Sequence, residues 1–304
     1  PMLGADVCLE GFGEQQQQSY TKEQEDHMLR EAVQAAEEAD IVVLAIGEDR
    51  LQSGEATSNA NIRIPEVQEA LLDRIAEVNQ NIVVVLFSGR PLDIREINKK
   101  AKAILQVWLP GTEGARAIAD TLFGKYNPSG KLPMSFPYCV GQVPVHYNEY
   151  STGRPHVEGK DKDRFRSKYL DIPNEPLYPF GYGLSYTTFE VSDIHLDRTW
   201  MDTSGQIEAE VTVKNTGNCT GTETLQLYIH DIAASVVRPV RELKDFKKVT
   251  LRPGEEKKVV FTITEQQLLF LTENGIYESE AGEFEIFIGK DSSTDNKASF
   301  VLKK

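Results

Sequence analysis

Apolar and polar residues recur with two different periods along the chain, and the period changes near residue 190. Before that point, apolar runs at 41–46, 82–87 and 103–108 are separated by segments in which apolar residues recur every three or four positions. Short apolar runs are typical of buried strands, and the longer period is typical of amphipathic helices. Strands and helices in this alternation predict right-handed crossovers and a doubly wound, mostly parallel sheet with helices on both faces.

Local start and stop residues place the helices between these strands. Thr21 with Gln24 forms a capping-box pattern, Pro65 suits a first helical position, and Gly124 suits a helix end. The expected helices begin after Thr21, run from 65 to 78, follow residues 90–92 as far as Lys99, and run from 114 to 123. Residues 7–9 are a possible first strand.

From residue 191 onward the period is two. Apolar residues alternate with polar ones at 207–213, 225–229, 259–263 and 284–288, with Pro-Gly and Asn-Gly turns at 253–254 and 274–275. This pattern predicts an antiparallel β-sandwich of immunoglobulin-like size. We therefore expect two domains, an α/β sandwich at 1–182 and a β-sandwich at 183–304, with a solvated excursion of mixed charge at 156–168.

Composition narrows the class of partner. The chain has 304 residues, 40% of them hydrophobic, and a formal charge of -14, which suits a globular protein and would repel nucleic acid phosphates and anionic lipids. No apolar run approaches the roughly 20 residues of a membrane span, and residues 1–4 lack the features of a signal peptide. The three cysteines and five histidines show no metal-ligand spacing, so we expect no metal site.

The polar loop at 47–59 follows the strand at 41–46 and precedes a helix, which places it at the carboxyl end of the sheet, where open α/β folds bind ligands. Glu55 is the candidate for chemistry, with Glu48 and Asp49 as rivals closer to the strand end. On position alone, an ordinary solvated carboxylate is the favoured interpretation of Glu55. Trp108, at a strand end, is a candidate ligand contact, although a tryptophan at such a position more often packs in the core or at a domain interface.

Several motifs occur in an order that resembles a known family. They are SGEATS at 53–58, WLPGTEG at 108–114, YNPSGKLP at 126–133 and PFGYGLSY at 179–186. Together they resemble the C-terminal half of a bacterial glycoside hydrolase family 3 enzyme of the periplasmic β-glucosidase type. RPVRELKDF at 238–246, with PGE at 253–255, resembles the fibronectin type III-like domain that ends many such enzymes.

The resemblance implies a retaining exo-acting β-glycosidase that releases glucose, or xylose as a second reading, from short glycans. It makes Glu55 the general acid/base, and we expect the Glu55 side chain to be exposed to solvent in this chain. It also places the nucleophilic aspartate on a TIM-like barrel that precedes this part of the polypeptide. The implied partners are an oligosaccharide or β-glucoside substrate and that barrel, without nucleic acid, membrane or cofactor. The implied location is periplasmic or secreted. Asn59 departs from the arginine that relatives often carry, which removes an ion pair from that position.

Two other functions remain open from the sequence. The chain could be a non-catalytic module that binds carbohydrate or supports another domain. A flavodoxin-like nucleotide binder ranks last, because no glycine-rich phosphate loop follows a strand and Glu48 and Asp49 would repel a phosphate. Arg90 and Arg154, each in a Gly-Arg-Pro sequence, are interpreted as structural arginines that anchor loop carbonyls.

Overall fold

The computed structural model describes residues 20–49, 51–156, 159 and 163–304, which form two compact units. The first contains the residues up to 119 together with 137–143, and the second contains 120–136 together with 144–304. These units group residues by contact, so the domain boundary expected between 182 and 183 stays a prediction. The possible strand at 7–9 lies outside the described residues.

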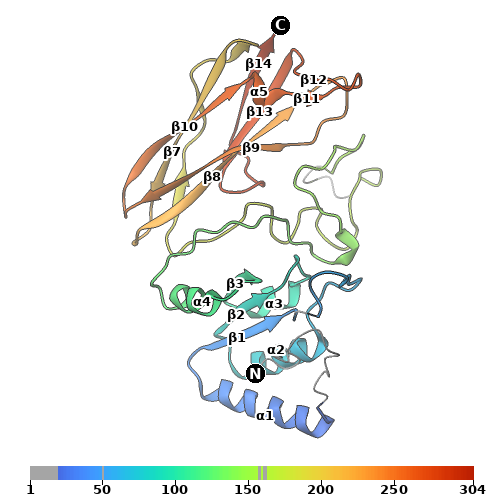
Figure 1. Cartoon of the computed structure of the whole chain (residues 1–304), viewed down its shortest axis with the longest axis vertical. Helices are drawn as coiled ribbons and strands as arrows, with labels where there is room; N and C mark the ends of the chain where they lie inside the picture. Colours follow the sequence, from blue (N-terminus) through green and yellow to red (C-terminus); the bar gives the residue numbers. More distant parts are fainter. Residues whose placement is uncertain (1–19, 50, 157–158, 160–162) are drawn as a thin grey trace. The chain divides into compact units, whose positions relative to one another are not determined.

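A parallel three-stranded sheet forms the centre of the first unit (Figure 1), with strand order β1-β2-β3. Its elements are α1 (Lys22–Glu38), β1 (Val42–Gly47), α2 (Glu66–Val78), β2 (Ile82–Phe87), α3 (Arg95–Lys100), β3 (Ala103–Trp108), α4 (Gly114–Leu122, which ends in the second unit) and the 3-10 turn η1 (Val140–Gln142). The strands and helices expected in this region are confirmed to within about two residues, the usual scatter of element ends. Consecutive strand order with right-handed crossovers places α2 and α3 on the same face of the sheet.

Local capping follows the sequence with one correction. Thr21 and Gln24 form the expected capping box, since each side chain accepts a hydrogen bond from the other's backbone N–H. Pro65 is the N-cap of α2 and not its first helical residue, because its ψ of 140° is extended. Its carbonyl still accepts hydrogen bonds from the amides of Gln68 and Glu69, so it closes the first turn from outside.

Burial explains the apolar run of β2. As the central strand it carries Ile82, Val84 and Leu86 at 0% exposure, and Val83 and Phe87 are half-buried. In the edge strand β1, Leu44 and Ile46 are buried, while Val43 and Ala45, which alternate with them, are exposed. The sheet therefore packs most fully at its centre, and its loops leave from a rigid base.

The second unit contains the β-sandwich. One sheet has the order β10-β7-β4 with β5 also paired to β7, the other has the order β6-β14-β13-β8-β9, and β11 and β12 form a hairpin. The elements are β4 (Phe189–Val191), β5 (His195–Leu196), β6 (Trp200–Asp202), β7 (Gln206–Asn215), β8 (Gly221–Asp231), β9 (Glu242–Leu251), β10 (Glu256–Thr264), α5 (Glu265–Leu268), β11 (Phe270–Leu271), β12 (Tyr277–Glu278), β13 (Gly282–Gly289) and β14 (Lys297–Lys303). All pairings are antiparallel except that of β14 with β6.

The core of the sandwich follows the period of two in the sequence. Ile207, Ala209 and Val211 on β7 are at most 1% exposed, and they face a core that includes the stacked rings of Phe284 and Phe300, 5.4 Å apart. Burial of apolar area on this scale is the main favourable contribution to folding of such a domain. The immunoglobulin-like β-sandwich expected from the alternation is confirmed.

Two of the motif segments pack onto the sandwich. Asn127 donates to the carbonyl of Thr220 and accepts from the Ser185 hydroxyl and the Tyr186 amide. Gly181, in the left-handed region at a φ of +79°, accepts a hydrogen bond from Gln226 on β8. These motif residues therefore have a structural role inside the second unit.

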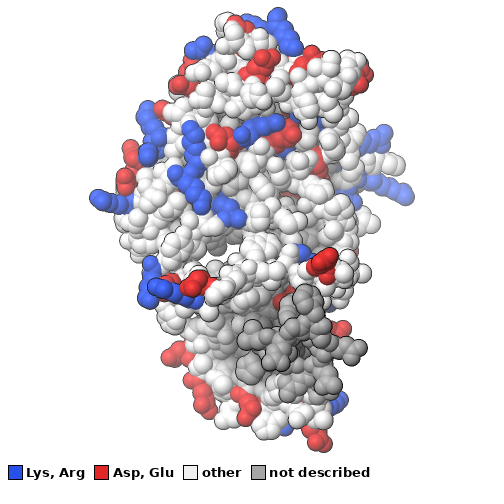
Figure 2. All heavy atoms as spheres, viewed as in Figure 1, with Lys and Arg blue, Asp and Glu red and all other residues white. Residues whose placement is uncertain are grey.

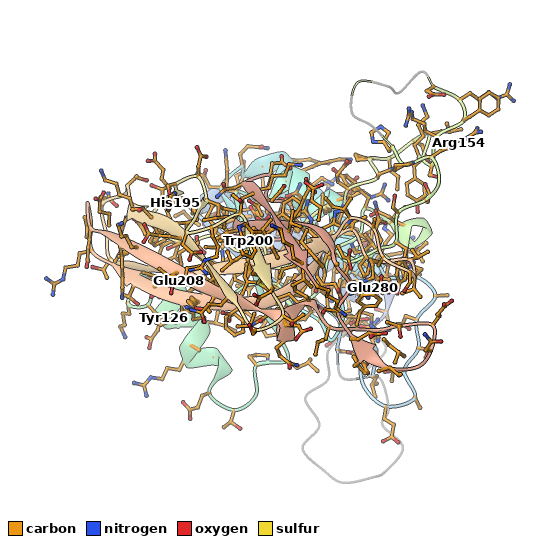
Figure 3. The ribbon with its side chains drawn as sticks, turned by 90° about the horizontal axis from the view of Figure 1, so that it is seen from above. Tyr126, Arg154, His195, Trp200, Glu208 and Glu280 are labelled. Carbon is orange, nitrogen blue, oxygen red and sulfur yellow. The ribbon has the colours of Figure 1, made fainter. Side chains whose placement is uncertain are left out.

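The excursion predicted at 156–168 has little regular structure in its described part. Figure 3 shows Arg154 on a loop that projects away from the strands. The Arg154 carbonyl accepts from the Ser167 amide, and the side chain of Arg166 donates to the carbonyl of Pro155. Among the described residues, the side chain of Arg166 anchors this loop, and the anchoring role expected for Arg154 stays a prediction.

Candidate active site

Three loops meet at the carboxyl edge of the parallel sheet. In the strand register, Gly47 pairs with Phe87, and Phe87 pairs with Trp108 across an irregularity after Leu86. The loops that follow β1, β2 and β3 therefore leave from one row of residues. A Cβ atom placed on Gly89 would lie 1.8 Å from the Ser53 Oγ atom, so the first two loops are in direct contact.

Glu55 lies at the exposed tip of the first loop, as expected. Its neighbours have unusual backbones, since Gly54 has a φ of 143° and Ala56 a φ of 58°. A positive φ in a residue other than glycine costs free energy and persists only where the surroundings impose it. In the part of the chain that the structure describes, no hydrogen bond or ion pair holds the Glu55 carboxylate.

Glu48 has a different environment. Its side chain is 3% exposed, its Oε1 atom lies 3.1 Å from Arg90 Nε, and its Oε2 atom accepts from the Gly89 amide at 3.3 Å. A carboxylate buried in this way against a guanidinium is engaged in holding the two loops together. The sequence placed Glu48 among the rivals for the acid role, and the geometry gives it a structural one.

Asp49 stabilises the turn that follows. Its Oδ1 atom accepts from the amides of Leu51 and Gln52, at 2.7 and 3.0 Å. This is the usual local use of aspartate after a strand, where the side chain replaces a backbone acceptor. Both rivals of Glu55 are therefore committed to loop structure.

Arg90 follows β2 and reaches the first loop with its other nitrogen. Its Nη2 atom donates to the carbonyls of Gln52, at 2.6 Å, and Thr57, at 3.0 Å. The carbonyl-anchoring role expected for this arginine is confirmed. The sequence could have signalled the pair with Glu48, because Glu48 directly follows β1 and Arg90 lies in the loop that follows the adjacent parallel strand β2.

Asn59 supports the same loop without a charge. Its Nδ2 atom donates to Glu48 Oε1 at 3.3 Å and to the Gln52 carbonyl at 3.1 Å. Position 59 makes no ion pair, as expected, and the ion pair that supports this loop is the one between Arg90 and Glu48. The loop is thus held by charge-assisted contacts that originate on the neighbouring strand.

Trp108 ends β3 and is half-buried, with a φ of 53°. It is one of two residues other than glycine with positive φ in the described chain, and the other is Ala56 beside Glu55. The next residue, Leu109, is 59% exposed, and its Cδ1 atom would lie 3.8 Å from a Cβ on Gly89. The predicted sugar contact at Trp108 stays a prediction.

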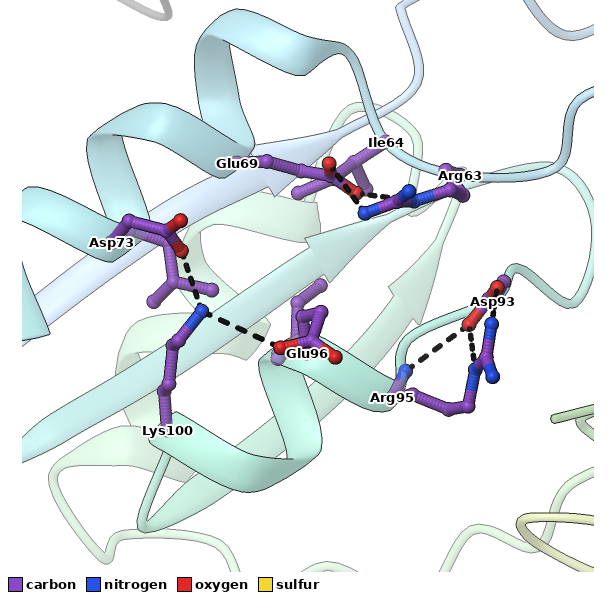
Figure 4. Close-up of a pocket in the computed structure, with 10 residues that line it drawn as sticks. Arg63, Ile64, Glu69, Asp73, Asp93, Arg95, Glu96 and Lys100 are labelled. Carbon is purple, nitrogen blue, oxygen red and sulfur yellow. Dashed lines mark hydrogen bonds and ion pairs between the residues drawn. The ribbon is translucent and has the colours of Figure 1, made fainter. Parts of the chain in front are cut away.

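A cavity of about 310 Å³ lies between α2 and α3 (Figure 4). It is lined by charged groups that pair with one another: Arg63 with Glu69, Arg95 with Asp93, and Lys100 with Asp73 and Glu96. The hydrogen bond from Lys100 to Asp73 raises the pKa of the Lys100 ammonium, and the hydrogen bond from Lys99 lowers the pKa of Glu96. Neither Glu55 nor Trp108 lines this cavity, and each charged group that lines it has a partner of opposite charge.

Other classes of site find no support in the described residues. Among them, no group of three or more His, Cys, Asp or Glu side chains is arranged to hold a metal ion. No helix in the described segments has the length and apolar character needed to cross a bilayer. On the face shown in Figure 2, acidic and basic side chains are interspersed.

Comparisons with known proteins agree with the motifs. The model of the glycosyl hydrolase family 3 C-terminal domain matches residues 6–186, and that of the fibronectin type III-like domain matches residues 223–292. A periplasmic beta-glucosidase of Salmonella typhimurium is 48% identical over 275 residues, which cover 90% of this chain and 36% of that protein. A beta-xylosidase of Formosa agariphila is 41% identical over 266 residues, which cover 88% of this chain and 36% of that protein.

Among solved structures, a β-glucosidase from Listeria innocua in complex with glucose superimposes with a TM-score of 0.87 at 40% identity. That match covers 94% of this chain and 39% of the Listeria chain. This chain therefore spans little more than a third of the length of these relatives. From the family match over residues 6–186 and these identities, the chain belongs to glycosyl hydrolase family 3, of which it carries the C-terminal domain and a fibronectin type III-like domain.

Proposed function

We propose that this chain supplies the general acid/base, Glu55, to a retaining, exo-acting β-glycosidase that hydrolyses O-glycosidic bonds of short glycans. The observation that carries the proposal is the contrast among the loop carboxylates. Glu48 is buried against Arg90 and Asp49 closes a turn, while Glu55 is exposed at the carboxyl edge of the sheet. β-Glucosidase is the preferred activity and β-xylosidase the second, because relatives bear both names.

The chemistry needs two carboxyl groups. One attacks the anomeric carbon and forms a glycosyl ester, and the other protonates the leaving oxygen as its bond to that carbon breaks. In our proposal Glu55 gives that proton, and its carboxylate then removes a proton from the water that hydrolyses the ester. We assign the nucleophile to an aspartate on a barrel domain of the same polypeptide, following the family resemblance.

Trp108 is our proposed substrate contact. Its backbone ends β3 at the edge of the sheet that the Glu55 loop leaves, through the pairings of Phe87 with Gly47 and Trp108, and aromatic faces pack well against the apolar faces of sugar rings. The positive φ of Trp108 supports a functional constraint at this strand end. Replacement of Trp108 with alanine is expected to raise KM more than it lowers kcat.

The proposed partners are a β-glucoside or short oligosaccharide and the barrel domain. The α/β unit of the chain would then form one wall of a composite cleft. We propose a periplasmic or secreted location, which is supported by the printed name of the Salmonella relative. The proposed mechanism uses no cofactor.

The test is a Glu55→Gln variant of the complete gene product, assayed on aryl β-glucosides and β-xylosides. We expect kcat/KM to fall by about 100-fold or more for substrates with poor leaving groups. Glu66→Gln, at the exposed first turn of α2, is the matched control and should leave activity unchanged. Unchanged turnover in Glu55→Gln would remove the assignment.

Calorimetry on the chain by itself tests the alternative of a carbohydrate-binding module. One wall of a composite cleft is expected to bind glucose or cellobiose weakly or not at all. Tight binding by the chain without any partner would favour the module over the proposed catalytic role.

A further inference from the structure

The loop that carries Glu55 is tied down on both sides of that residue by one side chain. Arg90 Nη2 donates to the carbonyl of Gln52, three residues before Glu55, and to the carbonyl of Thr57, two residues after it. The two acceptors bracket the tip at 53–56, of which residues 54–56 are exposed. A single planar guanidinium therefore fixes the separation of the two ends of the tip.

Arg90 is in turn held in place by a buried partner. Its Nε atom lies 3.1 Å from Glu48 Oε1, and Glu48 Oε2 accepts from the amide of Gly89 next to Arg90. Glu48 is also anchored through its own amide, which donates to the Phe87 carbonyl at 2.8 Å. Because Glu48 is attached to the end of β1 and Arg90 to the end of β2, the pair connects the loop to the rigid sheet.

Shorter contacts complete the arrangement around the tip. The Thr57 hydroxyl donates to the Gly54 carbonyl at 2.7 Å, and Asn59 donates to the same Gln52 carbonyl that Arg90 binds. Ser53 is 8% exposed and sits against Gly89, where a Cβ atom would overlap its Oγ atom. These contacts restrain the backbone of the tip while the Glu55 side chain stays exposed.

We propose that Arg90, held by Glu48, is the positioning residue of the acid/base: it sets where the Glu55 carboxyl stands relative to the leaving oxygen. This inference rests on the proposed function of Glu55. Displacement of a catalytic group by about 1 Å can lower the rate by about 100-fold, so a tether of this kind has a direct kinetic consequence. Arg90 itself does not touch the reacting atoms.

Lysine is the informative substitution at position 90. It keeps the positive charge, but a single ammonium on a flexible stem cannot reproduce the fork that binds Glu48 and two carbonyls at once. Arg95→Lys is the matched control. Arg95 makes a two-bond pair with Asp93 in the same connection after β2, without any contact to the Glu55 loop among the contacts of the described residues.

The kinetic test compares leaving groups in the complete gene product. A dinitrophenyl group departs as an anion without a proton, whereas a phenyl group needs one, so loss of acid catalysis lowers kcat/KM selectively for the phenyl glycoside. For Arg90→Lys we expect a fall of about 30-fold with the phenyl glycoside and less than about 3-fold with the dinitrophenyl glycoside. Arg95→Lys should change neither value.

Azide gives a second kinetic signature. In the glycosyl ester formed by the nucleophile, azide attacks the anomeric carbon as the ester bond breaks, which yields the glycosyl azide and the free carboxylate without a general base. Added azide should therefore raise kcat of Glu55→Ala and, to a smaller extent, of Arg90→Lys with the dinitrophenyl glycoside. A residue that only stabilised the fold would show neither the leaving-group effect nor the azide effect.

Hydrogen exchange on the 304-residue chain tests the tether without activity. The amides at 53–57 should exchange about 10-fold faster in Arg90→Lys than in the parent chain, because the lost contacts no longer oppose local opening. In Arg95→Lys their exchange rates should equal those of the parent chain. Should Arg90→Lys fold poorly, the double variant Glu48→Gln with Arg90→Met removes both charges, leaves no unpaired ion, and should show the same behaviour.

The outcomes separate the two proposals. If Glu55→Ala shows no leaving-group effect and no azide rescue, the proposed function of Glu55 fails. If Glu55→Ala shows both, while Arg90→Lys shows equal losses for both leaving groups or unchanged exchange at 53–57, the positioning role of Arg90 fails and the function of Glu55 stands.

Discussion

Lys131 and Glu223 form a buried ion pair inside the second unit. Lys131 Nζ lies 2.7 Å from Glu223 Oε1, and the two side chains are 13% and 7% exposed. Lys131 also donates to the carbonyl of Gly183, and Glu223 accepts from the amide of Thr224. The pair thus connects the motif segment at 126–133 to strand β8.

Removal of one partner of this pair should be costly. Lys131→Met would leave the Glu223 charge buried without its cation, and we expect a loss of about 3 to 5 kcal/mol. Hydrogen exchange of the β8 and β13 amides would measure the stability of this unit by itself. Lys258→Met is the control, because the exposed pair of Lys258 with Glu210 should contribute less than about 1 kcal/mol. Equal effects of the two variants would contradict the prediction.

Gly47 should tolerate no side chain. Its φ is 138°, and a Cβ atom there would lie 1.8 Å from the carbonyl oxygen of Phe87 on the paired strand. For Gly47→Ala we expect a loss on the order of 3 kcal/mol, since both backbone strain and a backbone overlap must be relieved. Gly54 is the control, because it has a similar φ of 143° but no atom near the position of a Cβ, so that only the backbone strain remains. Gly54→Ala should therefore cost only about 1 kcal/mol. The amides of β1 and β2 report both effects, and similar losses would exclude the overlap as the cause.

Tyr228 should matter through its hydroxyl. It is fully buried and donates to Gln226 Oε1, while Gln226 Nε2 donates to the carbonyls of Gly181 and Lys290. Burial raises the pKa of the Tyr228 phenol, so it remains a donor throughout the usual pH range. Tyr228→Phe leaves the Gln226 oxygen without this donor and should cost about 1 to 3 kcal/mol. Urea unfolding, monitored by hydrogen exchange of the β8 amides, measures this loss of unfolding free energy. Tyr277→Phe is the control, because Tyr277 is exposed.

Asp231 should make the free energy of unfolding fall as the pH rises, which is the opposite of the usual effect of a carboxylate. It is 8% exposed, its Oδ2 atom has no hydrogen-bond partner among the described residues, and burial raises its pKa above the ordinary 3.8 despite the opposing effect of Arg238. Between 3.8 and the raised pKa, the folded state binds more protons than the unfolded state, so stability falls as the pH rises. The cost is fully present above the raised pKa and absent below 3.8.

The Asp231→Asn variant removes this titration. Its unfolding free energy relative to the parent chain should therefore be most favourable near neutral pH and should become less favourable as the pH falls towards 3.8. Urea unfolding of both proteins at a series of pH values gives the difference directly. A difference that stays constant with pH would show that Asp231 has an ordinary pKa in the folded chain.

Much of the fold follows from residues that are close in sequence. The alternation of Ile207, Ala209 and Val211 predicted β7, and the run at 82–87 predicted the central strand β2. These predictions succeed because side-chain period is a property of a strand or helix by itself. The position of Glu55 in a loop after a strand was equally local, so the sequence by itself determined which loop would carry the candidate chemistry.

The tertiary structure decided which carboxylate in that loop is available. Glu48, Asp49 and Glu55 are alike as residue types, and the carboxylate of the first is buried in contact with Arg90 and Gly89, which are far from it in the sequence, and with Asn59. It also decided that Asn59 needs no charge, because the cation is Arg90, in the loop after the neighbouring strand β2. Such choices depend on contacts between residues far apart in the chain, which form only when the strands pair, and no local period in the sequence encodes them.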